Sequence, residues 1–307
     1  MRANREANPP VDWIDYCHSI GLGGAEVSAP PTNPEGINKF RDKIQSYNMH
    51  VIFNVKLPEA EADMPGFEAG VKAASQIGAT GLHAALTQRR YEQFDSFAAF
   101  KSNFEKNQKS VAMAEPILRK YKLRLAIENH KGWRSAEQAA WMKRLSSEYV
   151  GVHFDFGNNI SLCERPMETL DNLLPYTFSG HIKDRAVAPY QDGFLLSEVV
   201  LGDGFLDLNT MVQKLRRKDP NMILDLEMIT REPLKIPVFT DKYWVTFDDS
   251  YSPLPGRDLA RLLEIVHKKS TKKPLPKTAG MSPGEQLKQE DENNLTSVLY
   301  ARKNLGL

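Results

Sequence analysis

The stretch that decides the fold is Leu123-Arg124-Leu125-Ala126-Ile127-Glu128-Asn129-His130. Its apolar run, with β-branched character, predicts a strand that is buried on both faces. The run ends in a carboxylate, an amide and an imidazole, which are costly to bury without partners. In a barrel of parallel strands, chemistry sits at the carboxyl ends of the strands. We therefore interpret this stretch as a barrel strand whose last residues belong to a functional site.

Three later runs repeat this design of an apolar strand with polar residues at its end. They are Val150-Gly151-Val152-His153-Phe154-Asp155, Thr177-Phe178-Ser179-Gly180-His181-Ile182-Lys183-Asp184 and Met222-Ile223-Leu224-Asp225-Leu226-Glu227. The four strand ends together offer Glu128, Asp155, His181 and Glu227. Three carboxylates and one imidazole suit a single divalent metal ion, Mn²⁺ or Mg²⁺ in the first place, with Co²⁺ or Zn²⁺ as alternatives. Asp225 and Glu227 alternate with apolar residues, so one is expected to be a ligand and the other an internal partner.

The whole chain alternates between predicted strands and predicted helices. Strands are predicted at 25–27, 51–57, 81–86, 123–129, 150–156, 177–183 and 222–228, and helices at 11–20, 34–47, 66–77, 96–121, 135–149, 167–174, 208–217 and 256–268. Ser135 is expected to cap its helix with Gln138 as a capping-box partner, and Asp207 to cap another. This alternation predicts a parallel sheet with helices outside, the α/β class.

Seven predicted strands are one short of a (β/α)₈ TIM barrel. Residues 1–10 are unsuited to the first strand, because they are polar and end in adjacent prolines. We therefore expect a TIM barrel over residues 1–269 that lacks its first strand or is truncated there. Residues 270–283 read as a linker, and 283–305 as a helix with an apolar stripe that covers this barrel or a partner subunit. We expect this tail, 270–307, to contribute to a homo-oligomer contact.

Composition excludes several classes of protein. The chain has 307 residues, 41% hydrophobic and 26% charged, and its net charge of +1 disfavours nucleic acid as a partner. Cys17 and Cys163 are too few for a disulfide framework. No apolar run approaches the roughly 20 residues of a membrane span. The N-terminus has no signal-peptide core, so the chain is expected to be cytoplasmic as written, or exported if its N-terminus is truncated.

Five segments, in their order and spacing, resemble the sugar phosphate isomerase/epimerase family of xylose-isomerase-like TIM barrels. They are Ile127-Glu128-Asn129-His130, Gly151-Val152-His153-Phe154-Asp155, Gly180-His181-Ile182-Lys183-Asp184, Gly202-Asp203-Gly204 and Leu226-Glu227. The resemblance covers roughly residues 11–269. It implies that Glu128, Asp155, His181 and Glu227 bind one divalent ion, that Glu128 and Glu227 also transfer protons, and that Arg185 binds substrate. Asn158 departs from the family, because many relatives have a histidine there.

Further residues stand at or just after strand ends, where substrate contacts are expected. The expected pocket residues are Lys56, His83, His130, Trp133, Asn158, Asp184 and Arg185. Ordinary alternatives exist for three of them: a solvated Lys56, a packed His83 and a core or rim Trp133. Asp184 could instead orient a neighbouring ligand or bind the ion.

The function predicted from these residues is a metal-dependent isomerase or epimerase for a ketose, a keto-sugar or a related polyol. It would act by proton abstraction next to a carbonyl. A lyase or dehydratase acting on a keto-inositol or a 3-keto-glycoside would begin with the same step. Two further alternatives are a non-catalytic sugar-binding barrel and an AP-endonuclease-like DNA-repair enzyme, which would need more histidines than the seven present. The expected partner is therefore a small sugar, with neither nucleic acid nor membrane.

Overall fold

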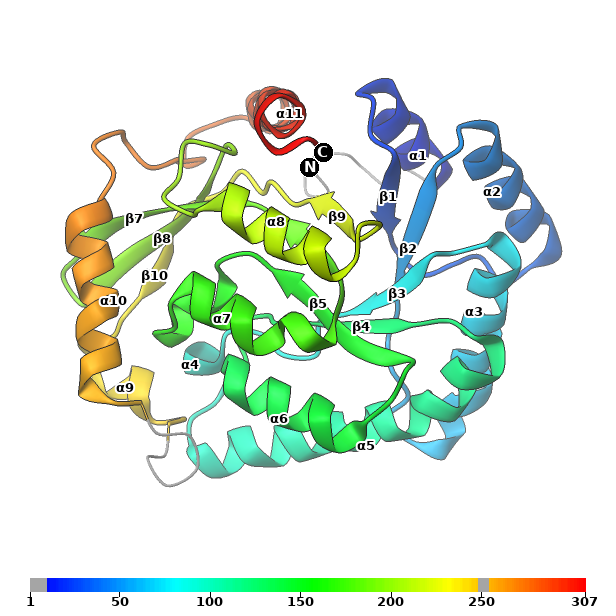
Figure 1. Ribbon diagram of the computed structural model, residues 1–307, viewed down its shortest axis with the longest axis horizontal. Helices are drawn as coiled ribbons and strands as arrows, with labels where there is room; N and C mark the ends of the chain where they lie inside the picture. Colours follow the sequence, from blue (N-terminus) through cyan, green and yellow to red (C-terminus); the bar gives the residue numbers. More distant parts are fainter. Residues whose placement is uncertain (1–9, 248–253) are drawn as a thin grey trace.

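A computed structural model describes residues 10–247 and 254–307. Its centre is a seven-stranded parallel sheet in the order β1-β2-β3-β4-β5-β6-β9, curved almost into a closed barrel (Figure 1). The strands are β1 (Gly24–Val27), β2 (His50–Asn54), β3 (Gly81–Ala84), β4 (Leu125–Glu128), β5 (Val150–Asp155), β6 (Thr177–Ile182) and β9 (Ile223–Leu226). All seven strands predicted from the sequence are confirmed, and so is the TIM-barrel class.

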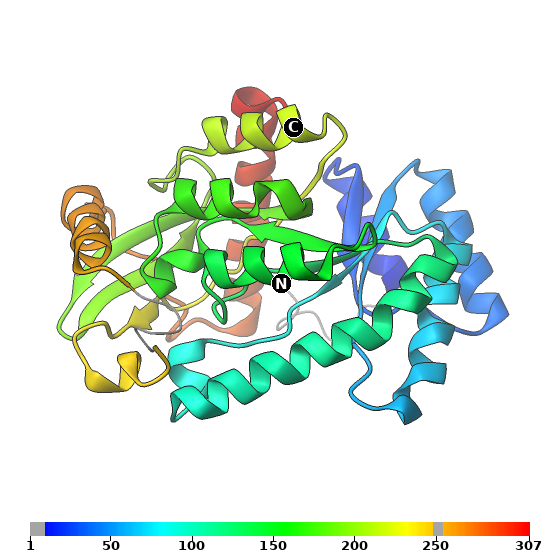
Figure 2. The same ribbon diagram turned by 60° about the horizontal axis from the view of Figure 1, so that its bottom comes forward.

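The helices lie outside this sheet, as the alternation predicted. They are α1 (Pro10–Ser19), α2 (Pro34–Ser46), α3 (Met64–Ile77), α4 (Arg90–Gln93), α5 (Phe97–Tyr121), α6 (Ser135–Leu145), α7 (Pro166–Leu173), α8 (Leu208–Lys218), α9 (Asp241–Trp244), α10 (Gly256–Lys269) and α11 (Pro283–Tyr300). The long helix α5 runs along one side of the barrel (Figure 2). No helix among the described residues is long and apolar enough to cross a bilayer.

One of the two predicted helix caps is correct. The Asp207 side chain accepts a hydrogen bond from the backbone N–H of Thr210 at 3.1 Å, as an N-cap should. The predicted capping box of Ser135 and Gln138 is wrong, because Ser135 is already the first helical residue of α6. Its hydroxyl donates to Glu164, and Gln138 donates to the backbone carbonyl of Ile127. Both side chains therefore connect α6 to neighbouring parts of the chain instead of capping its N-terminus.

The barrel has a seam between β1 and β9, the two edge strands of the sheet. No strand precedes α1 in the described part of the chain, and residues 1–9, which fall in the segment judged unsuited to a strand, lie outside it. A hydrogen bond of 3.3 Å from His50 on β2 to Asp225 on β9 crosses the seam. The C-terminal segment lies over the seam: Tyr16 of α1 bonds Asp291 of α11 at 2.9 Å, and Arg216 of α8 bonds the Gly306 carbonyl at 2.8 Å (Figure 1).

The predicted tail helix packs against its own barrel. The Ser297 hydroxyl accepts the backbone N–H of Leu201 at 3.3 Å, and Asn293 donates to Thr230 at 2.9 Å. Residues 271–282, before α11, contain neither helix nor strand. The apolar stripe is only partly covered, since the side chains of Leu295 and Leu299 stay exposed.

A second, antiparallel sheet was not predicted. It consists of β7 (Asp184–Tyr190), β8 (Gly193–Val199) and β10 (Leu234–Ile236), in the order β10-β8-β7. Gln191 and Asp192 form the two-residue loop between β7 and β8, and the Asp-Gly pair at 192–193 is a known hairpin signal, so the sequence carried part of this information. The sheet begins two residues after β6 ends and therefore brings its own charged side chains to the barrel.

Candidate functional site

Three of the four predicted ligands meet at the carboxyl ends of neighbouring strands. Ligand atoms of Glu128 on β4, Asp155 on β5 and His181 on β6 lie within 4.8 Å of one another, and all three side chains are buried. The parallel register places Asp155 directly beside His181. Strand pairing therefore fixes this cluster.

Two atoms of the cluster have no hydrogen-bond partner within the described structure. They are Oδ1 of Asp155 and Nδ1 of His181, both fully buried. Buried polar atoms nearly always have partners, because an unpaired one costs free energy. A carboxylate oxygen and an imidazole nitrogen are also natural ligands of a divalent cation. The residues present therefore fit one such ion.

Glu227 stands beside the cluster rather than within it. Its Oε2 lies 3.9 Å from Nδ1 of His181, and its side chain is 28% exposed. The ammonium group of Lys183 forms ion pairs with Glu227 and, at 2.7 Å, with Oδ2 of Asp155. Burial opposes the charge on Lys183, but Asp155 and Glu227 outweigh burial and raise the pKa of Lys183. Lys183 thus links Glu227, the fourth predicted ligand, to Asp155 of the cluster.

Lys183 was not predicted as a site residue, although the sequence carries a signal for it. His181 and Lys183 are two residues apart at the end of one strand, and such residues point to the same face. A buried strand whose last inward positions are a histidine and a lysine predicts a cation next to the carboxylates.

Glu26 on β1 holds His181 from the other side. Nε2 of His181 donates a hydrogen bond of 3.0 Å to Oε2 of Glu26, which leaves Nδ1 as the nitrogen that is free to bind a ligand. Burial opposes a charged His181, but Glu26 and Glu227 outweigh it and raise the pKa of His181 well above its usual value. Glu26 was not predicted, because it lies within the shortest predicted strand and not at its end.

His83 joins the two sides of the site. Its Nε2 donates to Oε2 of Glu128 at 3.2 Å, and its Nδ1 bonds Asn54. Together with Glu26, His153 and His181 it forms a second group whose ligand atoms lie within 4.8 Å of one another. His83 thus lies in the polar interior of the barrel, and both of its ring nitrogens contact other side chains of the protein.

Asn158 and Arg185, two of the predicted substrate residues, also reach the cluster. Asn158 donates to Oε1 of Glu128 at 3.0 Å and accepts from Arg185 at 2.6 Å. Arg185 also donates to Glu198 of the second sheet at 3.0 Å. An amide and a guanidinium group thus surround the carboxylates.

Three other predicted pocket residues lie away from the cluster. Lys56 is exposed to solvent. Trp133 packs in an aromatic group, its ring centroid 5.1 Å from that of Phe104 and 5.1 Å from that of Trp141. The Asp184 carboxylate accepts backbone N–H groups from Arg185 and from a loop after β8, at Gly202, Gly204 and Leu206. The structure does not bring these three residues together with the metal ligands.

His130 and Asp225 are likewise bound to the protein. Nδ1 of His130 donates to the carbonyl of Thr87 at 2.6 Å, and burial, followed by the charge of Lys131, lowers the pKa of His130 to about 4. Oδ1 of Asp225 pairs with His50, whereas Glu227 stands beside the cluster.

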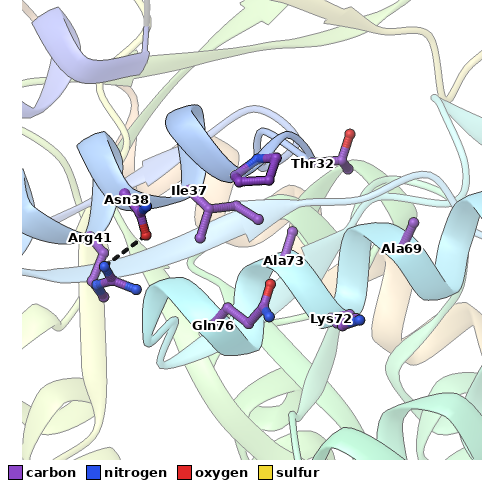
Figure 3. A pocket seen from close by; sticks show the side chains of 9 residues that line it. Thr32, Ile37, Asn38, Arg41, Ala69, Lys72, Ala73 and Gln76 are labelled. Atoms are coloured by element: carbon purple, nitrogen blue, oxygen red, sulfur yellow. Dashed lines mark hydrogen bonds between the residues drawn. The ribbon is translucent and has the colours of Figure 1, made fainter.

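A separate pocket lies on the outside of the barrel, between α2 and α3 (Figure 3). Its volume is about 480 Å³, and its lining includes the side chains of Arg41 and Lys72 but no carboxylate or imidazole. Arg41 is bonded to Asn38 at 2.8 Å. This lining has no carboxylate or imidazole that could bind a metal ion, unlike the cluster at the strand ends.

Comparison with known proteins finds one family whose model matches this chain, and similar proteins that include enzymes. A model of the xylose isomerase-like TIM barrel matches residues 14–243. The chain is 21% identical over 214 residues to the uncharacterized protein YihM of Escherichia coli strain K12, covering 67% of this chain and 62% of that protein. It is 28% identical over 109 residues to 3-oxo-isoapionate decarboxylase of Pectobacterium atrosepticum, covering 35% and 40%. The matches thus span less than two thirds of either relative.

Among solved structures, D-psicose 3-epimerase in the presence of D-fructose is similar to this chain. The TM-score is 0.61 at 13% identity, and the match covers 98% of this chain and 95% of the epimerase. At this identity the likeness shows the fold alone. Structural neighbours of this chain thus include an enzyme.

Replacing Glu26 by Gln tests its hold on His181. Gln keeps the size but removes the charge, so the pKa of His181 in the metal-free protein should fall, as followed by NMR of the ring protons. The affinity for Mn²⁺ should fall by about 10- to 100-fold, the usual effect of losing a partner of a metal ligand. The matched control is Glu35→Gln, at an exposed position of α2. An unchanged pKa of His181 in Glu26→Gln would show that Glu26 does not control this histidine.

Proposed function

Because this chain belongs to the xylose isomerase-like TIM barrel family, we propose that it is a sugar isomerase or epimerase. It moves a proton on the carbon next to the carbonyl of a ketose or keto-sugar. The observation that carries this proposal is the meeting of Glu128, Asp155 and His181, with two unpaired ligand atoms, beside the carboxylate of Glu227. Fold alone would not support it, because one fold serves many functions.

The proposed cofactor is one divalent ion, Mn²⁺ or Mg²⁺, held by Glu128, Asp155 and His181, with Glu227 as the fourth ligand. When bound, such an ion polarises a carbonyl and the adjacent hydroxyl, which makes the C–H between them more acidic. The carboxylate oxygens favour a hard cation.

The two glutamates are the proposed proton-transfer groups. Burial raises the pKa of both, but the charges of Lys183 and His181 outweigh it for Glu227, and a hydrogen bond from His83 and nearby histidines outweigh it for Glu128. Both pKa values are therefore lowered, and both groups are ionised near neutral pH and able to accept a proton. Glu227, the more exposed of the two, is the one that a substrate reaches more directly.

A lyase is the second candidate, and one observation favours it. The relative with 28% identity is a decarboxylase of a keto compound, 3-oxo-isoapionate. A lyase of this kind would cleave a bond next to the carbonyl of a sugar, as would one acting on a keto-inositol or a 3-keto-glycoside. Product analysis separates the two candidates, because isomerisation and epimerisation conserve every atom of the substrate.

The substitutions Glu128→Gln and Glu227→Gln test the proton-transfer roles. Each should lower kcat/KM by at least ~10²-fold, the lower end for loss of a general base. Metal content is measured in parallel, since both residues are also proposed ligands. The matched control is Glu92→Gln, at an exposed position on α4. Full activity in either variant with its metal retained would remove that glutamate from the mechanism.

Solvent deuterium gives a second readout of the same step. In D₂O the wild-type protein should place deuterium on the carbon next to the carbonyl. Turnover without deuterium in product or recovered substrate would count against exchange of the abstracted proton with solvent.

We also propose that α11 contributes to a contact between copies of this chain. Leu295 and Leu299 lie four residues apart on one helical face and are 45% and 64% exposed. The double substitution Leu295→Glu/Leu299→Glu should lower the mass measured by light scattering to the 34.7 kDa of one chain. Thr296→Glu, also at an exposed position of α11, is the control for added charge. A wild-type mass of one chain, or an unchanged oligomer in the double variant, would contradict this proposal.

A further inference from the structure

Lys131 is a buried cation that the proposed proton transfer does not use. The residue is 3% exposed. Its ammonium group has no hydrogen bond and no ion pair with any residue in the described part of the chain, whereas Lys183 forms ion pairs with three carboxylates. A buried charge normally has a partner, because desolvation without one is costly. Lys131 therefore has no carboxylate partner of its own, and an anion bound from outside the protein would stabilise its charged form.

The backbone around Lys131 is held firmly in place. Its carbonyl accepts the N–H of Arg90 at 2.9 Å, and the preceding His130 is bound to Thr87. At Gly132 any side chain would collide with Thr87, since a Cβ would lie 1.7 Å from its Oγ1. On the C-terminal side of this segment, the ring of Trp133 packs against Phe104. The position of Lys131 is thus set by contacts unrelated to its charge.

The surroundings of Lys131 are rich in positive charge. Burial, then Arg185 and Lys183, lower the pKa of Lys131 to about 7, although Asp155 and Glu128 attract a proton to it. Both carboxylates have other partners: Oδ2 of Asp155 pairs with Lys183, and Glu128 accepts from His83 and Asn158. The Nε of Arg185 is also buried without a partner in the described structure. Two cationic groups beside the metal ligands therefore have N–H donors to spare.

We propose that the substrate of this site is an anionic keto-sugar whose oxyanion, a carboxylate or a phosphate, binds the ammonium group of Lys131. This inference rests on the proposed function for the location of the site, and it adds the class of substrate. A charge-assisted contact of this kind is stronger than one between neutral groups. The same contact would hold the reacting carbons of the sugar in one orientation next to Glu128 and Glu227.

Binding measurements with three probes test this proposal. The probes are 2-keto-D-gluconate, which carries a carboxylate, D-fructose 6-phosphate, which carries a phosphate, and neutral D-fructose. Each is titrated calorimetrically into the Mn²⁺-loaded wild-type protein and into the Lys131→Met and Lys56→Met variants. Met keeps the apolar stem of the lysine without its charge, and Lys56 is an exposed control.

At least one anionic probe should bind the wild type more tightly than D-fructose does. Lys131→Met should weaken that binding by about 10- to 100-fold, the effect of losing a hydrogen bond to a charged group, and leave D-fructose unchanged. The probe whose binding weakens in Lys131→Met shows whether the oxyanion is a carboxylate or a phosphate. If neither anion binds more tightly than D-fructose, or if Lys131→Met changes no affinity, the inference is wrong.

Thermal melting without ligand gives a readout that does not depend on binding. Because Lys131 is buried without a partner, Lys131→Met should raise the melting temperature or leave it unchanged. A fall in the melting temperature relative to Lys56→Met would show that Lys131 has a structural role and would overturn the inference.

These results are separable from a failure of the proposed function. Loss of anion binding in Lys131→Met, with full activity in the Glu128→Gln and Glu227→Gln variants, would keep the anion site and reject the proton-transfer roles. Unchanged anion binding in Lys131→Met, with loss of activity in both Gln variants, would keep the proton-transfer roles and reject the anion site.

Discussion

Repulsion between the carboxylates at one end of the barrel is the constraint on which its interior depends. Glu26, Glu128, Asp155 and Glu227 come from four strands of one sheet and meet near its carboxyl edge. Like charges at such distances in a medium of low dielectric constant cannot all be ionised unless cations lie between them. His181 and the amine of Lys183 supply part of that compensation. The unpaired atoms of Asp155 and His181 mark where a further cation fits.

The same polar interior helps to hold a barrel that is open at one edge. A closed barrel has a complete ladder of backbone hydrogen bonds, but here β1 and β9 are both edge strands. Side chains replace part of the missing ladder, since His50 reaches Asp225 and His181 reaches Glu26 across the interior. Helix α11 lies over the seam from outside. The groups that form the site therefore also stabilise the fold around it.

The sequence was informative wherever side-chain placement follows from strand pairing. Glu128, Asp155 and His181 could be predicted because the carboxyl ends of adjacent parallel strands share one edge. Trp133 and Asp184 were assigned to the pocket from the same proximity, but the direction of a side chain after a strand depends on contacts with distant elements. The partners of Asp184, for example, lie in a loop 18 to 22 residues further on. No local pattern could show that the amine of Lys131 has no partner.

The central claim is that Asp155 and His181 leave a place for one divalent ion, and metal stoichiometry tests it most directly. Mn²⁺ binding is measured by calorimetry and by elemental analysis for the wild type, Asp155→Asn and Asp225→Asn. Asp225 is an acid of the same barrel interior whose partner is His50, so it serves as the matched control. The account predicts one ion per chain in the wild type and in Asp225→Asn, and loss of binding in Asp155→Asn. A wild type that binds no ion, or an Asp155→Asn variant that binds as tightly as the wild type, would contradict it.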